Sequence, residues 1–218
     1  MKILHRCWWT LTIAGAAMAV QPAELTLAGN RLLVSGMLDG SAVQNFLDHL
    51  RRGNVRTVVF ENSLGGTAEA AGLYAQAIRD TGVSTELIGQ CYAACAYAYL
   101  AGKVHRFGEG EQVNALLIPV GTRPKPGELA SRWRGEEAHK TLAEFTAPGT
   151  PDGEVVNVEE GTPKEKWRPE HGVLFTATPT LFGRVYNTYY CDGTQGRDLT
   201  RCELLSDADP RKLGVITD

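Results

Sequence analysis

The chain has 218 residues, with 22 Lys and Arg against 25 Asp and Glu, so its formal net charge is −3 at pH 7. This length suffices for one domain with an appendage and a buried core. No cluster of basic residues offers the surface that nucleic acid requires, and no apolar run beyond the N-terminal segment is long enough to cross a membrane.

The N-terminal segment has the order of a secretory signal peptide. Lys2 and Arg6 precede an apolar run from Cys7 to Val20, and Ala17-Met18-Ala19 forms an A-x-A cleavage site. The alternative is a membrane anchor, but the run is shorter than the roughly 20 apolar residues of a spanning helix. We expect cleavage after residue 19, export to the periplasm or the medium, and no stable membrane anchor. The mature chain then keeps 20 basic and 25 acidic residues, a net charge of −5.

The next hundred residues alternate between strand and helix patterns. Strands are expected as a hairpin over 25–37 and over 55–61, 83–88, 104–107 and 114–120. Helices are expected over 41–50, 68–79 and 91–101, the first capped by Ser41. Alternation of this kind predicts βαβ units, so the expected fold class is α/β with a mostly parallel sheet.

The sequence changes in character after residue 127. A charged helix is expected over 128–145, followed by an exposed loop rich in Pro, Gly and Glu over 147–169. Residues 173–191 alternate as a β-strand does, and a turn follows between two cysteines. The predicted organisation is a signal peptide, an α/β core, a charged helix with its loop, and a β-rich C-terminal extension, over 1–19, 20–127, 128–172 and 173–218.

Four cysteines remain once Cys7 leaves with the signal peptide: Cys91, Cys95, Cys191 and Cys202. An even number in an exported protein indicates disulfides, and three connectivities are open. We favour Cys91–Cys95, because residues four apart on a helical turn have Cα atoms about 6 Å apart. The pair Cys191–Cys202 then closes a loop of about a dozen residues, worth on the order of 3 kcal/mol. A metal site is disfavoured because no histidine lies near either pair at ligand spacing.

Two turns in the core carry a recognisable pattern. Residues 58–67 (VVFENSLGGT) resemble the strand of the ClpP/crotonase superfamily that ends in Asn-Ser-Pro-Gly-Gly-Ser and runs into a helix. Residues 89–96 (GQCYAACA), followed by Arg106, resemble its nucleophile turn, which exported ClpP-like members write as Cys-x-Ser-Ala-Cys. The resemblance covers about residues 30–120 and implies a ClpP/crotonase-like fold of stacked βαβ units.

The resemblance also implies an oxyanion-hole-like pocket. Gly65 and Gly66 would supply one backbone N–H donor, since glycine lets the backbone approach a ligand closely. Ala94 would supply the second donor from a helix N-terminus, where free N–H groups favour negative charge. The alternative is that the two glycines merely turn a strand into a helix.

The two chemical groups of the family are missing. Its serine falls on Ala93 and its histidine on Leu117, whereas Pro119 still matches the family's proline. An alanine methyl cannot attack a carbonyl group, so loss at both positions indicates loss of the catalytic dyad. Ser63 and Tyr92 carry hydroxyl groups that could substitute, but roles as a backbone cap and a packing residue explain them better.

Three functions follow in order of preference. The first is a catalytically silent exported protein that keeps the pocket as a binding or assembly surface for a peptide or protein. The second is a hydrolase of peptide or ester bonds with an unrecognised nucleophile. The third is crotonase-type thioester chemistry, which needs acyl-CoA and is not expected outside the cytoplasm. We expect no cofactor and no metal. Assembly into a homo-oligomer stays open, since superfamily members often form rings or trimers.

Overall fold

The computed structural model describes residues 22–120, 123–125, 128–129, 132–133, 171–195 and 198–217. The predicted signal peptide, most of the predicted helix over 128–145 and the predicted loop over 147–169 lie outside these residues. None of the helices in the described part is long and apolar enough to span a membrane.

Strands and helices alternate through the first half of the described chain. The elements are β1 (Glu24–Ala28), β2 (Arg31–Ser35), α1 (Val43–Arg51), β3 (Thr57–Ser63), α2 (Ala68–Thr81), β4 (Ser84–Tyr92), α3 (Ala94–Tyr99), β5 (His105–Phe107) and β6 (Asn114–Pro119). The predicted hairpin is confirmed: β1 and β2 are antiparallel, and Ala28 pairs with Arg31 across the turn. Ser41 does not cap α1, because its hydroxyl donates to Asp39 and the helix starts after Ala42 without a side-chain cap.

The second half is mainly β-structure. Its elements are β7 (His171–Thr180), β8 (Gly183–Asp192), the 3-10 helix η2 (Leu199–Arg201) and β9 (Glu203–Leu204). β7 and β8 form a long antiparallel hairpin, and β7 pairs antiparallel with β6, so this half continues the sheet of the first.

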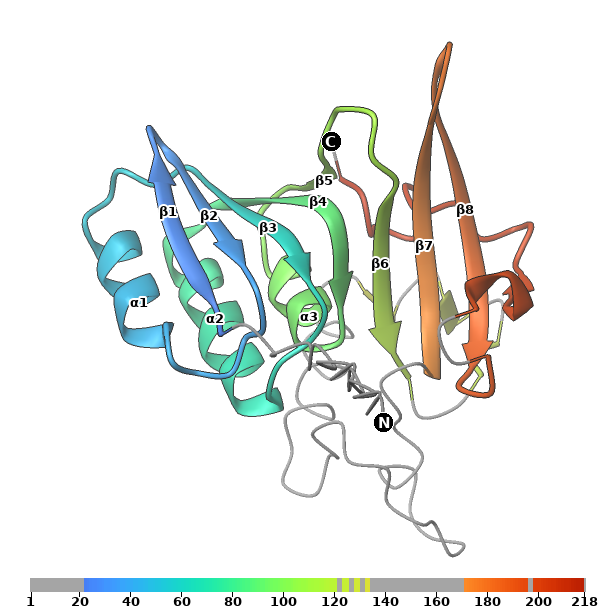
Figure 1. Ribbon diagram of the computed structural model, residues 1–218, viewed down its shortest axis with the longest axis horizontal. Helices are drawn as coiled ribbons and strands as arrows, with labels where there is room; N and C mark the ends of the chain where they lie inside the picture. Colours follow the sequence, from blue (N-terminus) through green and yellow to red (C-terminus); the bar gives the residue numbers. More distant parts are fainter. Residues whose placement is uncertain are drawn as a thin grey trace, which may run out of the picture.

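One nine-stranded sheet runs through the described residues, in the order β1-β2-β3-β4-β6-β7-β8-β9, with β5 beside β4. Its centre is parallel, from β2 through β3 and β4 to β6, and its flanks are antiparallel. The fold class is therefore α/β, as predicted. Figure 1 shows the three helices along one face of the sheet and the β7–β8 hairpin projecting beyond the rest.

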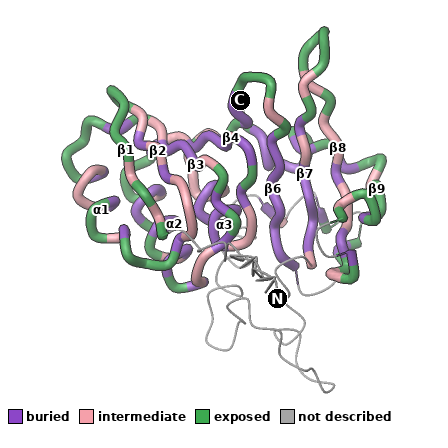
Figure 2. The backbone as a smooth tube through the Cα atoms, viewed as in Figure 1, coloured by how far each residue is buried: buried purple, intermediate pink, exposed green. Residues whose placement is uncertain are grey.

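The main core lies between the sheet and its helices, where the tube in Figure 2 is purple. Phe46 of α1 and Tyr74 of α2 pack at 4.4 Å between ring centroids, in one cluster with Val58 and Phe60 of β3. A second cluster lies on the other face of β6, since neighbouring residues of a strand point to opposite faces. Its buried members are Ala115, Leu117, Leu174, Cys191 and Cys202.

Both predicted disulfides are present. Cys91 and Cys95 are bonded, with Cα atoms 5.2 Å apart, and so are Cys191 and Cys202, with Cα atoms 4.6 Å apart. The structural reason for the Cys91–Cys95 pairing differs from the predicted one, which placed both cysteines on one helical turn. β4 continues to Tyr92 and α3 begins only at Ala94, so the bond joins a strand end to the first turn of a helix.

A buried carboxylate joins three strands at the opposite end of the parallel strands from the turn between β4 and α3. Glu86 of β4 accepts hydrogen bonds from Arg31 of β2 at 2.7 and 3.0 Å. It also accepts two from Arg106 of β5, at 2.7 and 2.9 Å. Burial alone would raise the pKa of Glu86, but these hydrogen bonds and the two positive charges hold it below its usual value.

Candidate functional site

The two turns of the sequence pattern lie next to each other. β3 and β4 are adjacent parallel strands, and Ser63 at the end of β3 pairs with Cys91 near the end of β4. Turns that follow neighbouring parallel strands meet at the carboxyl edge of the sheet, where α/β proteins bind ligands. We call Gly65, Gly66, Ala93 and Ala94 at this edge the elbow site.

Gly66 is held by a backbone bridge to the segment after β2. The N–H of Leu38 donates to the carbonyl oxygen of Gly65 at 3.0 Å, and the N–H of Thr67 donates to Leu38 at 2.9 Å. In a parallel bridge of this kind, the residue between the two bonds directs its own N–H to the other side. The N–H of Gly66 therefore points away from the segment that follows β2.

Local backbone geometry alone requires both glycines. Gly65 and Gly66 have φ angles of +141° and +146°, which other residues rarely adopt. A Cβ on Gly66 would lie 2.2 Å from the carbonyl oxygen of Leu38. The sequence left open whether the glycines serve the turn or a ligand, and the turn suffices to explain them.

Ala93 is the strained residue of the elbow site. Its φ and ψ are 50° and −112°, outside the regions that residues with a Cβ normally occupy. Such a conformation costs on the order of 1–3 kcal/mol and persists only where the surroundings impose it. Here the Ala93 N–H donates to the carbonyl oxygen of Leu117 at 3.0 Å, and the Cys91–Cys95 disulfide spans the turn.

Ala94 is the first residue of α3. The N–H groups of the first helical turn have no partner inside the helix, and Ala93 supplies no side-chain cap. Gly65 and Ala94 are buried, whereas Gly66 and Ala93 are half-buried. The elbow site is therefore mostly covered by the surrounding protein.

The side chain of Leu117 does not face the elbow site. Leu117 belongs to the second cluster, where Tyr92 packs against it, whereas Ala93 packs against the main core. Burial raises the pKa of the Tyr92 hydroxyl, so it stays protonated at neutral pH. Neither side chain is placed to exchange a proton with residue 93.

Ser63 carries the hydroxyl nearest in the chain to the glycine turn. It is fully buried, and its Oγ has no hydrogen-bond partner, so the expected role as a backbone cap is wrong. Its register with Cys91 puts its side chain on the face of the sheet that α2 and α3 cover. Since no base bonds to this hydroxyl, it is not activated as a nucleophile.

Two histidines, His105 and His171, form hydrogen bonds away from the elbow site. The Nδ1 of His105 lies 3.1 Å from the carbonyl oxygen of Val215, and the Nε2 of His171 lies 2.7 Å from the hydroxyl of Tyr190. His139 falls outside the described residues. Within the part of the chain that the structure describes, no group of three His, Cys, Asp or Glu could hold a metal ion.

The comparisons with known proteins find distant structural likeness alone. No family model matches the chain, and no curated protein matches it. DspI of Pseudomonas aeruginosa is similar at 12% identity and a TM-score of 0.35, over 49% of this chain and 56% of that one. An enoyl-CoA hydratase from Polaromonas sp. JS666 is similar at 13% identity and a TM-score of 0.36, and the match covers 56% of this chain and 63% of that one. A methylmalonyl-CoA decarboxylase is similar at 10% identity and a TM-score of 0.36, and the match covers 57% of this chain and 60% of that one.

These neighbours include enoyl-CoA hydratases, which are crotonase-type proteins. The match spans less than two thirds of the length of each of the three proteins. A likeness this distant gives no information about the substrate, reaction or assembly of this chain.

Proposed function

We propose that the protein is exported and binds a peptide or protein through the elbow site without hydrolysing it. The observation that supports this most is the backbone of Ala93, which keeps the strained turn of a nucleophile although its side chain is a methyl group. The turn places the N–H of Ala94 at the start of α3, and Gly66, in the neighbouring turn, directs its own N–H away from the segment that follows β2. A carbonyl or carboxylate oxygen is the group that two such donors bind.

The surroundings of the elbow site favour an apolar residue beside that oxygen. Leu64, between Ser63 and Gly65, is 56% exposed. The methyl group of Met37 lies 3.7 Å from the position that a Cβ on Gly65 would take. The ligand we propose is therefore a peptide segment or chain end with an apolar side chain next to the bound oxygen.

The absence of hydrolysis follows from the same geometry. Ala93 offers no nucleophile, and Leu117, at the family's histidine position, points into the second cluster. An oxyanion hole without its nucleophile and base retains a residual rate enhancement on the order of 10³–10⁴ over water, which an ordinary peptide-bond assay reads as zero.

A serine hydrolase remains the second candidate, on one observation. The unpartnered, buried Oγ of Ser63 lies one strand from Cys91 at the carboxyl edge of the sheet. A ligand that brought its own base would activate this hydroxyl.

Binding is tested by nuclear magnetic resonance on the nitrogen-labelled exported protein. Adding an N-acetylated leucine peptide should shift the amide signals of Gly66 and Ala94 before those of other residues. The matched variant is Ala94→Pro, which removes one donor at a helix position that tolerates proline. It should weaken binding about tenfold, the effect of one hydrogen bond of roughly 1.4 kcal/mol. Shifts confined to other residues, or unchanged affinity in a folded Ala94→Pro variant, would refute the proposal.

Export has its own test. Two disulfides suit an oxidising compartment, where such bonds persist. N-terminal sequencing of the protein from the periplasm or medium should begin at Val20, whereas a chain beginning at Met1 in the membrane fraction would contradict export.

A further inference from the structure

The tip of the β7–β8 hairpin displays two large apolar side chains. Leu181 and Phe182 form the turn between Thr180 and Gly183, and they are 96% and 99% exposed. Figure 1 shows this tip projecting beyond the other described strands and helices. Their apolar surface has no partner within the described chain.

The composition of this turn departs from ordinary hairpin chemistry. Two-residue hairpin turns favour Asn, Asp and Gly, which adopt the required backbone and face water. Here Thr180 supplies the local bonds instead, because its hydroxyl donates to the Gly183 carbonyl at 3.1 Å and accepts from the Phe182 N–H at 3.3 Å. A turn that breaks a local rule at exposed apolar residues is expected at a functional surface.

Arg184 fixes the tip to the body of the protein. Its guanidinium donates to the carbonyl oxygens of Ala177, Gly110 and Gln112, at 3.0, 2.6 and 3.1 Å. The β5–β6 loop therefore supports the hairpin close to its end. A preorganised apolar tip loses little conformational entropy when it binds.

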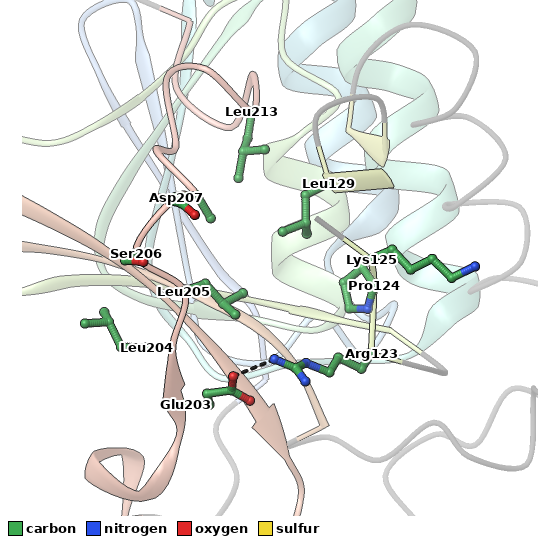
Figure 3. A pocket seen from close by; sticks show the side chains of 11 residues that line it. Arg123, Pro124, Lys125, Leu129, Glu203, Leu204, Leu205, Ser206, Asp207 and Leu213 are labelled. Carbon is green, nitrogen blue, oxygen red and sulfur yellow. Dashed lines mark hydrogen bonds and ion pairs between the residues drawn. The ribbon is translucent and has the colours of Figure 1, made fainter. Parts of the chain in front are cut away.

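A pocket of about 490 Å³ lies elsewhere on the same chain, beside β9. Its apolar lining consists of Pro124, Leu129, Leu204, Leu205, Ala208 and Leu213. Figure 3 shows Leu129, Leu205 and Leu213 pointing into a common space. Its volume lies within the usual range for ligand pockets, and the two tip side chains have fewer atoms than a typical ligand of such pockets.

The charge around the pocket is balanced. Arg123 forms an ion pair with Glu203 at its rim, and Lys125 and Asp207 add one charge of each sign. The tip, from Thr180 to Gly183, carries no charged side chain. An uncharged apolar tip therefore matches a pocket that is neutral as a whole.

The tip cannot reach the pocket of its own chain. β8 is paired with β7 along its whole length, and its residue Tyr189 pairs with Leu204 of the pocket wall. Six residues separate Tyr189 from Gly183, which is roughly 20 Å along a strand. Any contact between tip and pocket must therefore join two copies of the chain.

A lipid surface is the less favoured occupant. Glu109 and Glu111 are exposed on the loop that Arg184 ties to the hairpin, and they would face an anionic membrane with like charge. One leucine and one phenylalanine alone provide little insertion energy.

We infer that the hairpin tip of one copy inserts Leu181 and Phe182 into the β9 pocket of a second copy. The contact joins a different patch on each copy, so it forms either head-to-tail rings or chains, or a two-fold pair with two reciprocal contacts. Two side chains bury about 300–400 Å², well below a standard interface, so the association is weak and depends on concentration. It does not involve the elbow site, and it stands or falls independently of the proposed function.

Cross-linking between two variants that each carry one added cysteine tests the contact directly. Copies carrying Phe182→Cys are mixed with copies carrying Asp207→Cys, an exposed residue of the pocket wall. The matched control replaces Asp207→Cys by Leu73→Cys, exposed on α2. Disulfide-linked dimers should form at least about tenfold faster in the tip–pocket mixture than in the control, because binding raises the effective concentration of the two thiols.

Three results would overturn the inference. The first is equal cross-linking in both mixtures, and the second is faster cross-linking of Phe182→Cys copies with one another. The third is binding of the wild type to phosphatidylcholine vesicles that is lost on Phe182→Ser, without tip–pocket cross-linking. In support, sedimentation of the wild type should show association at high concentration that Leu181→Ser with Phe182→Ser abolishes and Leu73→Ser leaves unchanged.

Discussion

The N–H of Ala93 donates a hydrogen bond to the carbonyl oxygen of Leu117 at 3.0 Å, yet the two side chains enter different clusters. The positions at which the resembled family carries its serine and histidine are thus neighbours through their backbones alone. Alternation along β6 gives the reason, since Leu116 and Ile118 belong to the main core and Leu117 points to the opposite face.

Restoring the two family residues should therefore not restore reactivity. Ala93→Ser with Leu117→His would permit labelling by a fluorophosphonate only if both side chains faced one pocket. Because they do not, we predict that the double variant labels no faster than Ala93→Ser alone. Labelling of the double variant well above that of the single one would show that histidine at position 117 reaches the elbow site.

Glycine at the strained position should stabilise the protein. Ala93→Gly removes the Cβ that makes φ = 50° with ψ = −112° unfavourable, and this gain exceeds the entropy that glycine costs. We expect the free energy of unfolding to rise by about 1 kcal/mol in urea denaturation. The control Ala96→Gly, within α3, should lower it by about 1 kcal/mol. A loss of stability in both variants would mean that Ala93 is not strained.

The two disulfides should differ in both stability and function. Replacing Cys91 and Cys95 by serine opens a short loop and should cost about 2 kcal/mol, whereas replacing Cys191 and Cys202 should cost about 3 kcal/mol. Only the first pair spans the elbow site, so only its loss should weaken binding of the acetylated peptide. If the loss of either disulfide weakened binding equally, the Cys91–Cys95 bond would have no specific role in the elbow site.

Glu86 should make stability depend on acid pH. Its pKa in the folded protein is lowered, because hydrogen bonds from Arg31 and Arg106 outweigh the effect of burial. Its stabilising contribution is therefore complete above the unfolded pKa of about 4.3 and is lost as the pH falls through the lower folded value. Glu86→Gln should cost about 2 kcal/mol at pH 7, a figure reduced because both arginines are partly exposed.

Chemical denaturation of the wild type and Glu86→Gln between pH 3 and pH 7 measures this difference. The gap between the two proteins should narrow as the pH falls through the acid range. Glu61→Gln, which changes a half-buried carboxylate of β3, is the control. A constant gap would mean that the charge of Glu86 contributes nothing to stability.

Regular periodicity predicted most of the α/β core. The β-branched run at 55–61 and the alanine-rich run at 68–79 correspond to β3 and α2, and the hairpin about Gly29 is in place. The start of α3 was wrong by three residues. Nothing in the small residues from Cys91 onward marks the point where β4 ends, because pairing with β6 through Tyr92 decides it.

The remaining features depend on contacts between distant residues. The hairpin turn at Leu181 has no turn residue except Gly183, so the segment from 173 to 191 looked like uninterrupted strand alternation. The ion pairs of Glu86 could not be predicted from neighbouring residues either, since its arginine partners lie 55 and 20 residues away. An isolated acidic residue within an apolar strand was the only available indication.

The most direct test of the central claim is the reaction of the wild-type exported protein with a fluorophosphonate probe, together with casein and ester turnover. We predict no labelled protein and no turnover above background, because Ala93 has no nucleophile and the Ser63 hydroxyl has no base. Labelling that maps to Ser63, and is abolished by Ser63→Ala in a folded protein, would contradict the account and establish a hydrolase.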